Sequence, residues 1–429
     1  MNLTATTPVE SALRRGIKAV GIGKKGSRSL TRELSLEILA ELQKGEFTPA
    51  NRAAFFAALF IKGVTEDEQV LSEHFTPGTL SNAAQLAEVL CQDAPRPVKG
   101  LCTQLLAQKE LDQTQADDLG KFLLSTSSGK GDGARGLAAI ALRVRYETIE
   151  EYLSLLKNLN EHIHPDFRDT VPAGTPVVQL AEPFDGVDHN YMITPCLADA
   201  LQKQNMRVLT LVGRNSGPKL VNNLYDLVKK MGLTFLKNNT ELTGRRPAPE
   251  GGFYIDQKDL SPALDRWVDL RHEIIKRPFL ATLEKFLDPA KADIIITSAF
   301  HGVYGDKMAA VAEGAGFPGS IVVRNGVEGT IAFPLTRPAK LLCCARQSDG
   351  DYLHKEIVFD AAQFLQAELP TEEKLESPSL NINAKLVNDF LKKGGTENIE
   401  FDRRIAVTCA GIKQGIDWIL ENTNERRGA

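Results

Sequence analysis

One segment of the chain places a glycine, a cation and several polar side chains directly after an apolar run with the composition of a β-strand. The run spans residues 207–212, and the residues after it are Gly213, Arg214, Asn215, Ser216 and, further on, Lys219. Glycine lets backbone N–H groups approach an anion, while arginine and lysine neutralise its charge. A turn after a parallel strand lies at the carboxyl edge of the sheet, where open α/β folds bind ligands. These five residues are therefore candidate phosphate contacts.

A purely structural interpretation explains the same residues equally well. Gly-Arg-Asn-Ser is also ordinary turn chemistry, and the nearby lysines and arginines between residues 203 and 246 could form a solvated helix face. A second basic group lies between residues 14 and 28. The formal net charge of -4 and the pI near 6.1 give no global sign of a polyanionic partner. Any nucleic-acid surface would have to be local.

The sequence pattern of the second part of the chain predicts the strands and helices that position these residues. Apolar runs alternate with segments of helical pattern, and this order predicts a largely parallel sheet with helices on both faces. The predicted strands are residues 177–180, 207–212, 294–298, 320–323 and 339–344, and two closing helices are predicted at 384–393 and 405–421.

The first part of the chain, to about residue 161, has a helical pattern that is partly duplicated. Residues 30–44 carry leucine and isoleucine at helical spacing, residues 53–62 form a very apolar run, and an acidic N-cap follows at 65–68. Residues 136–143 and 147–151 repeat the last two features. We expect three domains: an extra helical module with a basic arm at 1–97, a second helical domain at 98–170, and an α/β domain at 171–429.

The bulk properties are those of a globular protein in a reducing compartment. The six cysteines are scattered, and their spacing predicts free thiols. No apolar run approaches the roughly 20 residues that span a bilayer, and the N-terminus has no secretory pattern. We therefore expect a cytoplasmic protein without a membrane segment. His301 follows a predicted strand, and a solvated loop histidine is its simplest interpretation.

The order of motifs resembles that of anthranilate phosphoribosyltransferases (glycosyltransferase family 3, class IV phosphoribosyltransferases). In that family a strand leads into Thr-Gly-Gly-Asp-Gly and then Asn-Ile-Ser-Thr, and Asp185, Gly186 and Thr194 match this frame at the correct spacing. Arg214 falls on the family's arginine. Arg271 precedes residues 277–289 as an arginine precedes a similar family segment. Glu328 stands at an aspartate of the magnesium loop. The resemblance implies a nucleoside-phosphorylase-like α/β fold preceded by a helical domain, which we provisionally assign to residues 98–170.

The chain differs from the family at the motifs that bind pyrophosphate and magnesium and carry out the transfer reaction. Glu182, Pro183 and Phe184 replace the Thr-Gly-Gly that would cradle a pyrophosphate, and proline has no N–H to donate. The other replacements are Thr210 and Leu211 for a lysine–histidine pair, Glu284 and Lys285 for a Gly-Pro turn, and Gly329 for the second magnesium carboxylate. A single carboxylate forms a poor dedicated magnesium site, and the sequence favours an ordinary loop carboxylate over a metal ligand for Glu328. Anthranilate transfer is not expected.

Three functions follow from the resemblance. The first is the binding of a phosphate-rich ligand, nucleic acid above all, as in a divergent branch of the family with similarly degraded motifs. The second is an active glycosyl or phosphoribosyl transferase that uses phosphoribosyl pyrophosphate and Mg²⁺ with an altered acceptor. The third is a dimeric interaction scaffold. The family also suggests a homodimer formed through the helical part. Of these three, the sequence favours the first.

Overall fold

The structure is a computed structural model that describes residues 10–23, 26–125, 129–169, 174–244, 247–299, 303–368, 370 and 375–423. The chain forms two compact units. One contains Met1–Leu155 together with Asp269–Leu280, and the other contains Leu156–Val268 together with Ala281–Ala429. In the described residues no helix is both long and apolar enough to cross a membrane. The predicted boundaries at 97 and 170 stay predictions.

The first unit is helical. Its elements are α1 Ala12–Val20, α2 Arg32–Gln43, α3 Pro49–Lys62, η1 Glu66–His74, η2 Thr79–Ser81, α4 Ala83–Leu90, α5 Arg96–Leu106, α6 Gln113–Leu124 and α7 Asp132–Arg145. The boundary between the units falls within α8, Ile149–Glu161, and within α14, Trp267–Ile274. Helix α3 begins with proline at its first position, after Thr48, and Thr48 and Asn51 form a capping box.

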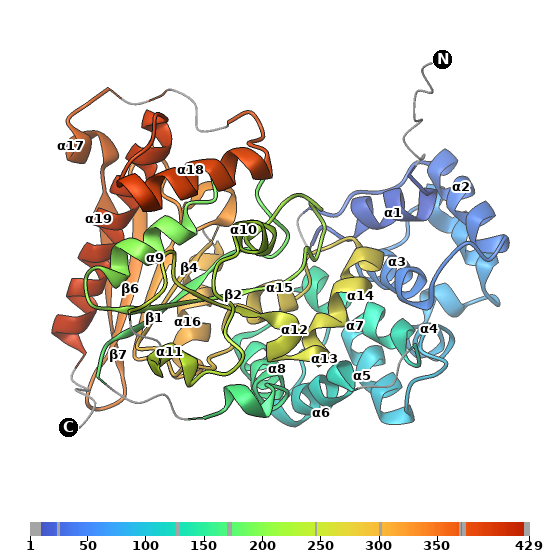
Figure 1. The fold of residues 1–429 in the computed structure, drawn as a ribbon. Coiled ribbons are helices and arrows are strands. Elements are labelled where there is room, and N and C mark those ends of the chain that lie inside the picture. The colour runs from blue at the N-terminus through green and yellow to red at the C-terminus, as the bar shows by residue number, and fades with distance from the viewer. Residues whose placement is uncertain are drawn as a thin grey trace, which may run out of the picture. The chain divides into compact units, whose positions relative to one another are not determined.

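The two segments predicted to repeat one another lie in α3 and α7, and these helices pack directly against each other (Figure 1). Gly136 of α7 permits this close approach, because a Cβ atom there would lie 2.3 Å from the carbonyl oxygen of Ala50 in α3. Gly133 is equally close to α4, where a Cβ would lie 2.0 Å from the carbonyl oxygen of Leu90. Both distances are far inside van der Waals contact, so the packing of α7 requires glycine at both positions.

The duplication extends to a buried carboxylate. Glu68 accepts hydrogen bonds from Leu30 N, Thr65 N and Lys62 Nζ, each at 2.8 Å. Burial alone would raise the pKa of Glu68, but these donors hold it below its ordinary value. A charge that is buried in this way is stable only because all of its partners are present.

Glu151 repeats this arrangement. It accepts hydrogen bonds from Leu111 N and Thr148 N, each at 2.9 Å, and from Arg145 Nη2 at 2.5 Å. In both copies the carboxylate joins the end of one helix to the residue that precedes another. In each copy of the repeat, one buried glutamate therefore connects two helix ends through the same kinds of hydrogen bond.

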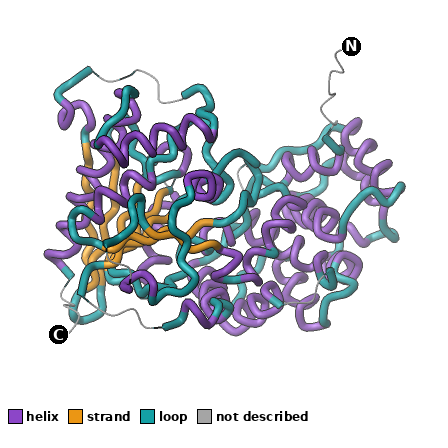
Figure 2. The backbone as a smooth tube through the Cα atoms, in the orientation of Figure 1, coloured by secondary structure: helices purple, strands orange, loops and turns teal. Residues whose placement is uncertain are grey.

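The second unit contains a seven-stranded sheet in the order β3-β2-β1-β4-β5-β6-β7. Its strands are orange in Figure 2. The strands are β1 Val177–Ala181, β2 Arg207–Val212, β3 Phe253–Asp256, β4 Ile294–Ser298, β5 Gly319–Val323, β6 Ala339–Arg346 and β7 Tyr352–Phe359. Strands β1 to β5 pair in parallel, whereas β6 and β7 are antiparallel. The predicted, mainly parallel α/β fold is confirmed; β3 and β7 were not predicted.

Helices cover both faces of this sheet. The helical elements are η3 Pro165–Phe167, α9 Thr194–Gln202, α10 Leu224–Met231, α11 Glu241–Gly244, α12 Gln257–Leu260, α13 Pro262–Asp265, α15 Leu280–Leu283, α16 Val303–Gly314, η4 Val327–Gly329, α17 Ala361–Leu365, α18 Leu380–Lys393 and α19 Ile399–Asn422. Side chains on one face, such as Ile321 and Cys343, lie against Gly415 of α19. Helix α16 packs on β4, β5 and β6. Strands β1, β2, β4 and β5 are buried throughout, as expected for parallel strands between helices.

The contact between α3 and α7 gives a direct test of the helical unit. Gly136→Ala is expected to lower the free energy of unfolding by about 3 kcal/mol, because the new methyl group would force the two backbones apart. Urea denaturation followed by circular dichroism measures this change.

The matched control is Gly100→Ala in α5, where an added Cβ meets no atom within 4 Å. This substitution is expected to raise the free energy of unfolding by roughly 0.5–1 kcal/mol through helix propensity alone. Equal effects of the two substitutions would show that α3 and α7 do not approach as closely as described.

Candidate functional site

The loop from β1 to α9 and the loop from β2 to α10 are joined at the carboxyl edge of the sheet. The side chain of Asn223 donates one hydrogen bond to Phe184 O and one to Gly213 O, each at 2.8 Å. The ring of Phe184 is buried and lies against Gly213, where an added Cβ would be 3.1 Å from it. Residues that follow these two strands therefore lie together at this edge.

Gly186 makes the closest contact between the two loops. Its φ of +91° is in the left-handed region, and a Cβ there would lie 2.6 Å from the carbonyl oxygens of Val221 and Asn222. Val187 N donates to Asn222 O at 3.1 Å, and Lys219 Nζ donates to Gly186 O at 3.3 Å. Only glycine fits here. The resemblance at Gly186 therefore coincides with a backbone requirement.

The carboxylate of Glu328 is held by the same region. Its Oε2 accepts hydrogen bonds from Asp188 N and His189 N, both at 2.9 Å, and its Oε1 lies 3.1 Å from Lys219 Nζ. Glu328 adopts a φ of +53°, which is uncommon for a residue with a side chain. Two N–H groups and one ammonium group thus surround one negative charge. We call Asp188 N, His189 N and Lys219 Nζ the anion cradle.

Arg214 is directed elsewhere. Its Nε lies 3.0 Å from Asp265 Oδ1, and its Nη2 donates to Asp265 O at 2.9 Å. Asn215 shapes the loop, since its side chain donates to Val221 O and accepts from Gly217 N at 3.1 Å. Ser216 is fully buried, and in the described part of the chain its Oγ has no hydrogen-bond partner. Of the predicted phosphate contacts, Lys219 therefore belongs to the anion cradle, whereas Arg214 and Asn215 bind other groups of the protein.

The remaining predicted residues lie in different environments. Asp185 is buried in the same loop, and Thr194 begins α9. Arg271 is buried in the part of α14 that belongs to the helical unit. His301 lies outside the described residues.

Glu182 is a feature that the sequence noted only as a replacement. It follows β1 directly, is buried, and accepts a hydrogen bond from Thr194 Oγ1 at 2.7 Å and a longer one from Ile331 N at 3.3 Å. Burial raises the pKa of Glu182 to about 7, although these hydrogen bonds and the nearby Lys285 oppose the shift. A glutamate at the end of a fully buried strand was the available signal, since such a group has a strongly perturbed pKa.

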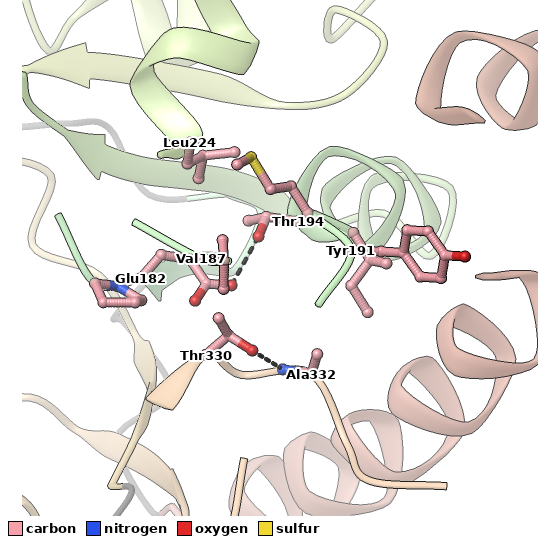
Figure 3. Close-up of a pocket in the computed structure, with 10 residues that line it drawn as sticks. Glu182, Val187, Tyr191, Thr194, Leu224, Thr330 and Ala332 are labelled. Atoms are coloured by element: carbon pink, nitrogen blue, oxygen red, sulfur yellow. Dashed lines mark hydrogen bonds between the residues drawn. The ribbon is translucent and has the colours of Figure 1, made fainter. Parts of the chain in front are cut away.

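A small hollow opens beside Glu182, and Figure 3 shows the hydrogen bond that joins Glu182 to Thr194 at its wall. It has room for little more than one water molecule. Tyr191 points away from it, and its hydroxyl accepts a hydrogen bond from Asn398 Nδ2 at 2.8 Å. The lining residues are Glu182, Pro183, Val187, Tyr191, Met192, Ile193, Thr194, Leu224, Thr330 and Ala332. The hollow is far too small for a diphosphate.

Many lysines and arginines of the two predicted basic clusters form ion pairs with carboxylates. In the cluster between residues 203 and 246, Lys203 pairs with Asp199 at 2.7 Å and Lys237 pairs with Asp259 at 2.8 Å. In the first cluster, Lys18 pairs with Glu10 at 2.7 Å. Local acids thus neutralise much of the positive charge. Lys24, Lys25, Arg245 and Arg246 lie outside the described residues.

Solved structures of known proteins share this architecture. Anthranilate phosphoribosyltransferase from Thermus thermophilus is 18% identical and covers 74% of this chain and 89% of its own, with a TM-score of 0.55. The enzyme from Saccharomyces cerevisiae, solved in complex with PRPP and Mg, is 14% identical and covers 77% of this chain and 98% of its own, also at 0.55. This chain has the anthranilate phosphoribosyltransferase fold. The fold implied by the resemblance is therefore confirmed.

The sequence comparisons assign no activity to this chain. A protein of Aquifex aeolicus (strain VF5), described only as uncharacterized, is 25% identical over 285 residues, which is 65% of this chain and 81% of that protein. No family model matches the chain. The anthranilate phosphoribosyltransferase fold is thus shared at an identity too low to carry function with it.

The raised pKa of Glu182 predicts how stability depends on pH. Between the ordinary pKa of a glutamate and about 7, the folded protein holds this proton while the unfolded chain has lost it, so stability falls as the pH rises through this window. Glu182→Gln removes this contribution. Relative to the wild type, the variant is expected to gain roughly 2 to 3 kcal/mol of stability between about pH 5 and about pH 8.

Urea denaturation of both proteins at the two pH values measures this difference. Glu376→Gln, at an exposed position of the same unit, is the matched control and should change the pH dependence little. A Glu182→Gln protein whose pH dependence follows the wild type would mean that Glu182 ionises as an ordinary carboxyl group.

Proposed function

We propose that this protein binds a phosphate-rich ligand, nucleic acid by class, at the carboxyl edge of β1 and β2, and that it does not transfer phosphoribosyl groups to anthranilate. The observation that supports this is the anion cradle, in which two backbone N–H groups and Lys219 lie within 3.1 Å of one carboxylate. A phosphate oxygen offers these donors the same charge and acceptor chemistry.

The ligand has to displace the carboxylate that now occupies the cradle. Glu328 is attached to the protein and competes with any external anion at a high effective concentration. A ligand with several phosphates could offset this competition through further cationic contacts. Its binding would weaken steeply with salt, because each neutralised phosphate releases a counterion.

The loop after β1 argues against the family's transferase reaction. Pro183 has no N–H, and the carbonyl oxygen and ring of Phe184 are bound by Asn223 and Gly213. Proline thus offers no backbone donor to a diphosphate, and Val187 N already donates to Asn222 O.

Mg²⁺, which the fold family implies, does not fit Glu328 in this arrangement. Both carboxylate oxygens already accept hydrogen bonds, one of them from an ammonium group. A metal ion at that position would lie beside the charge of Lys219, and the second carboxylate of the family pattern is Gly329 in this chain.

A transferase of altered acceptor specificity is the second candidate. The observation that favours it is the yeast enzyme of the same fold, whose structure holds PRPP and Mg. Calorimetric titration with phosphoribosyl pyrophosphate, with and without Mg²⁺, separates this candidate from the first. Magnesium-dependent heat of binding would support a transferase, whereas heat that does not depend on magnesium would support the anion cradle alone.

The third candidate, a scaffold that dimerises through its helical part, stays a prediction. The face of α7 that packs on α3 is occupied within the chain. A homodimer would therefore need another surface of the helical unit. Light scattering of the full chain distinguishes a monomer from a dimer.

Two substitutions test the anion cradle in opposite directions. Lys219→Met removes the ammonium group and is expected to weaken oligonucleotide binding by about tenfold, while Glu328→Gln removes the competing charge and is expected to strengthen it by a similar factor. Fluorescence anisotropy with labelled single-stranded and duplex DNA at low salt, followed by a salt titration, measures both effects.

Lys230→Met in α10 is the matched control, because it removes the same charge from an exposed position of a neighbouring element. It should change the affinity much less than Lys219→Met. The proposal fails if the wild-type protein retains no oligonucleotide at low salt, or if Lys219→Met and Lys230→Met weaken binding equally.

A further inference from the structure

A thiol, an imidazole and a carboxylate converge at the edge of the sheet, far along the chain from the anion cradle. They belong to Cys344 of β6, His354 of β7 and Glu313 near the end of α16. One potential ligand atom from each side chain lies within 4.8 Å of the other two. Neither the proposed ligand site nor the family resemblance uses any of these residues.

The fold fixes the positions of these three side chains. Cys344 and His354 are directly opposite each other in the antiparallel pair β6–β7, so their side chains project from the same face of the sheet. Helix α16 packs on that face. His354 Nε2 lies 2.6 Å from Glu313 Oε1, and the hydroxyl of Tyr352 donates to Phe317 O at 2.8 Å, beside the end of α16. Three separate elements thus deliver one ligand each.

We propose that Glu313, Cys344 and His354 form a binding site for a divalent transition-metal ion of the zinc class. Sulfur, imidazole nitrogen and carboxylate oxygen are the ligands that zinc takes, at about 2.0 to 2.3 Å. Ligand atoms of one such ion lie roughly 3 to 4 Å apart. The present separations need only side-chain rotation to reach that range.

Exposure supports access for an ion. Cys344 is buried, whereas the His354 side chain is 52% exposed and that of Glu313 is 22% exposed. The ion would therefore enter from the solvent side at the edge strand and meet the thiol last. Three protein ligands leave a fourth tetrahedral position for water, and it would face the solvent beside His354.

Binding must displace a proton. Burial raises the pKa of the Cys344 thiol to about 12, with the nearby Glu313 adding to the shift and Ser320 and Arg324 opposing it. The free thiol is therefore protonated at neutral pH. On binding, the metal–sulfur bond replaces the S–H bond, the proton leaves to solvent, and the hydrogen bond between His354 and Glu313 opens. One proton is released per ion from the thiol, so affinity should rise with pH.

The competing interpretation is a hydrogen-bonded cluster that closes the edge of the sheet without a metal. It requires the same contacts but differs in one measurable respect. A hydrogen-bonded cluster gives no thiolate–metal bond, whereas a metal site creates one. Spectroscopy with Co²⁺, which takes the same ligands as zinc and absorbs visible light, separates the two.

The experiment is a Co²⁺ titration of the full chain that has first been treated with a chelator. We expect one equivalent to bind with a thiolate-to-cobalt charge-transfer band and tetrahedral d–d bands, and Zn²⁺ to displace it. His354→Gln should weaken Zn²⁺ binding by more than about tenfold, since the loss of even an outer-shell partner costs that much. Cys344→Ser should abolish the charge-transfer band.

Cys409→Ser and His164→Gln are the matched controls, because they remove one thiol and one imidazole elsewhere in the same unit. Both should bind Co²⁺ as the wild type does. If Cys344→Ser does not fold, His354→Gln, at the half-exposed edge, decides the outcome alone. Absence of the charge-transfer band at one equivalent of Co²⁺, its persistence in Cys344→Ser, or an unchanged metal affinity in His354→Gln would overturn the proposal.

Discussion

The contact between the carboxylate of Glu328 and the anion cradle governs the interpretation of this molecule. It joins the loop after β1, the loop after β2 and the segment after β5 through one charge. A buried or half-buried carboxylate is stable only with such partners, and donors left without it would be equally unfavourable. The arrangement is therefore stable as it stands, and an external anion can enter only by exchange.

The neighbouring contacts hold two loops together at the same edge of the sheet. Asn223 binds Phe184 O in the loop after β1 and Gly213 O after β2, and the Phe184 ring fills space against Gly213. Backbone groups that could face a ligand are thus used in holding two loops together. The anthranilate phosphoribosyltransferase fold therefore occurs in this chain together with loops that are held by their own side-chain contacts. Fold depends on the sheet and its packing, whereas chemistry depends on a few loop atoms.

The helical unit follows a comparable principle. Each copy of its repeat closes around one buried glutamate, Glu68 or Glu151, whose donors come from adjacent helix ends. The acidic caps were visible in the sequence, and the pairing of residues 53–62 with 136–143 was predicted as a repeat. Their direct packing was not predicted, because it depends on Gly136 of α7 meeting the backbone of Ala50.

The sequence by itself determined the parallel α/β architecture, since β-branched runs between helical segments leave few other ways to bury both faces of a sheet. It also identified Gly186 and Lys219 as candidate ligand-binding residues and Glu328 as a candidate metal ligand. Only the tertiary structure decided how they are used: Arg214 faces Asp265, and Lys219 faces Glu328. It alone brought Glu313 beside Cys344 and His354. The physical reason is that local pattern fixes which residues are buried, whereas the partner of a charge depends on side chains that lie far away in the chain.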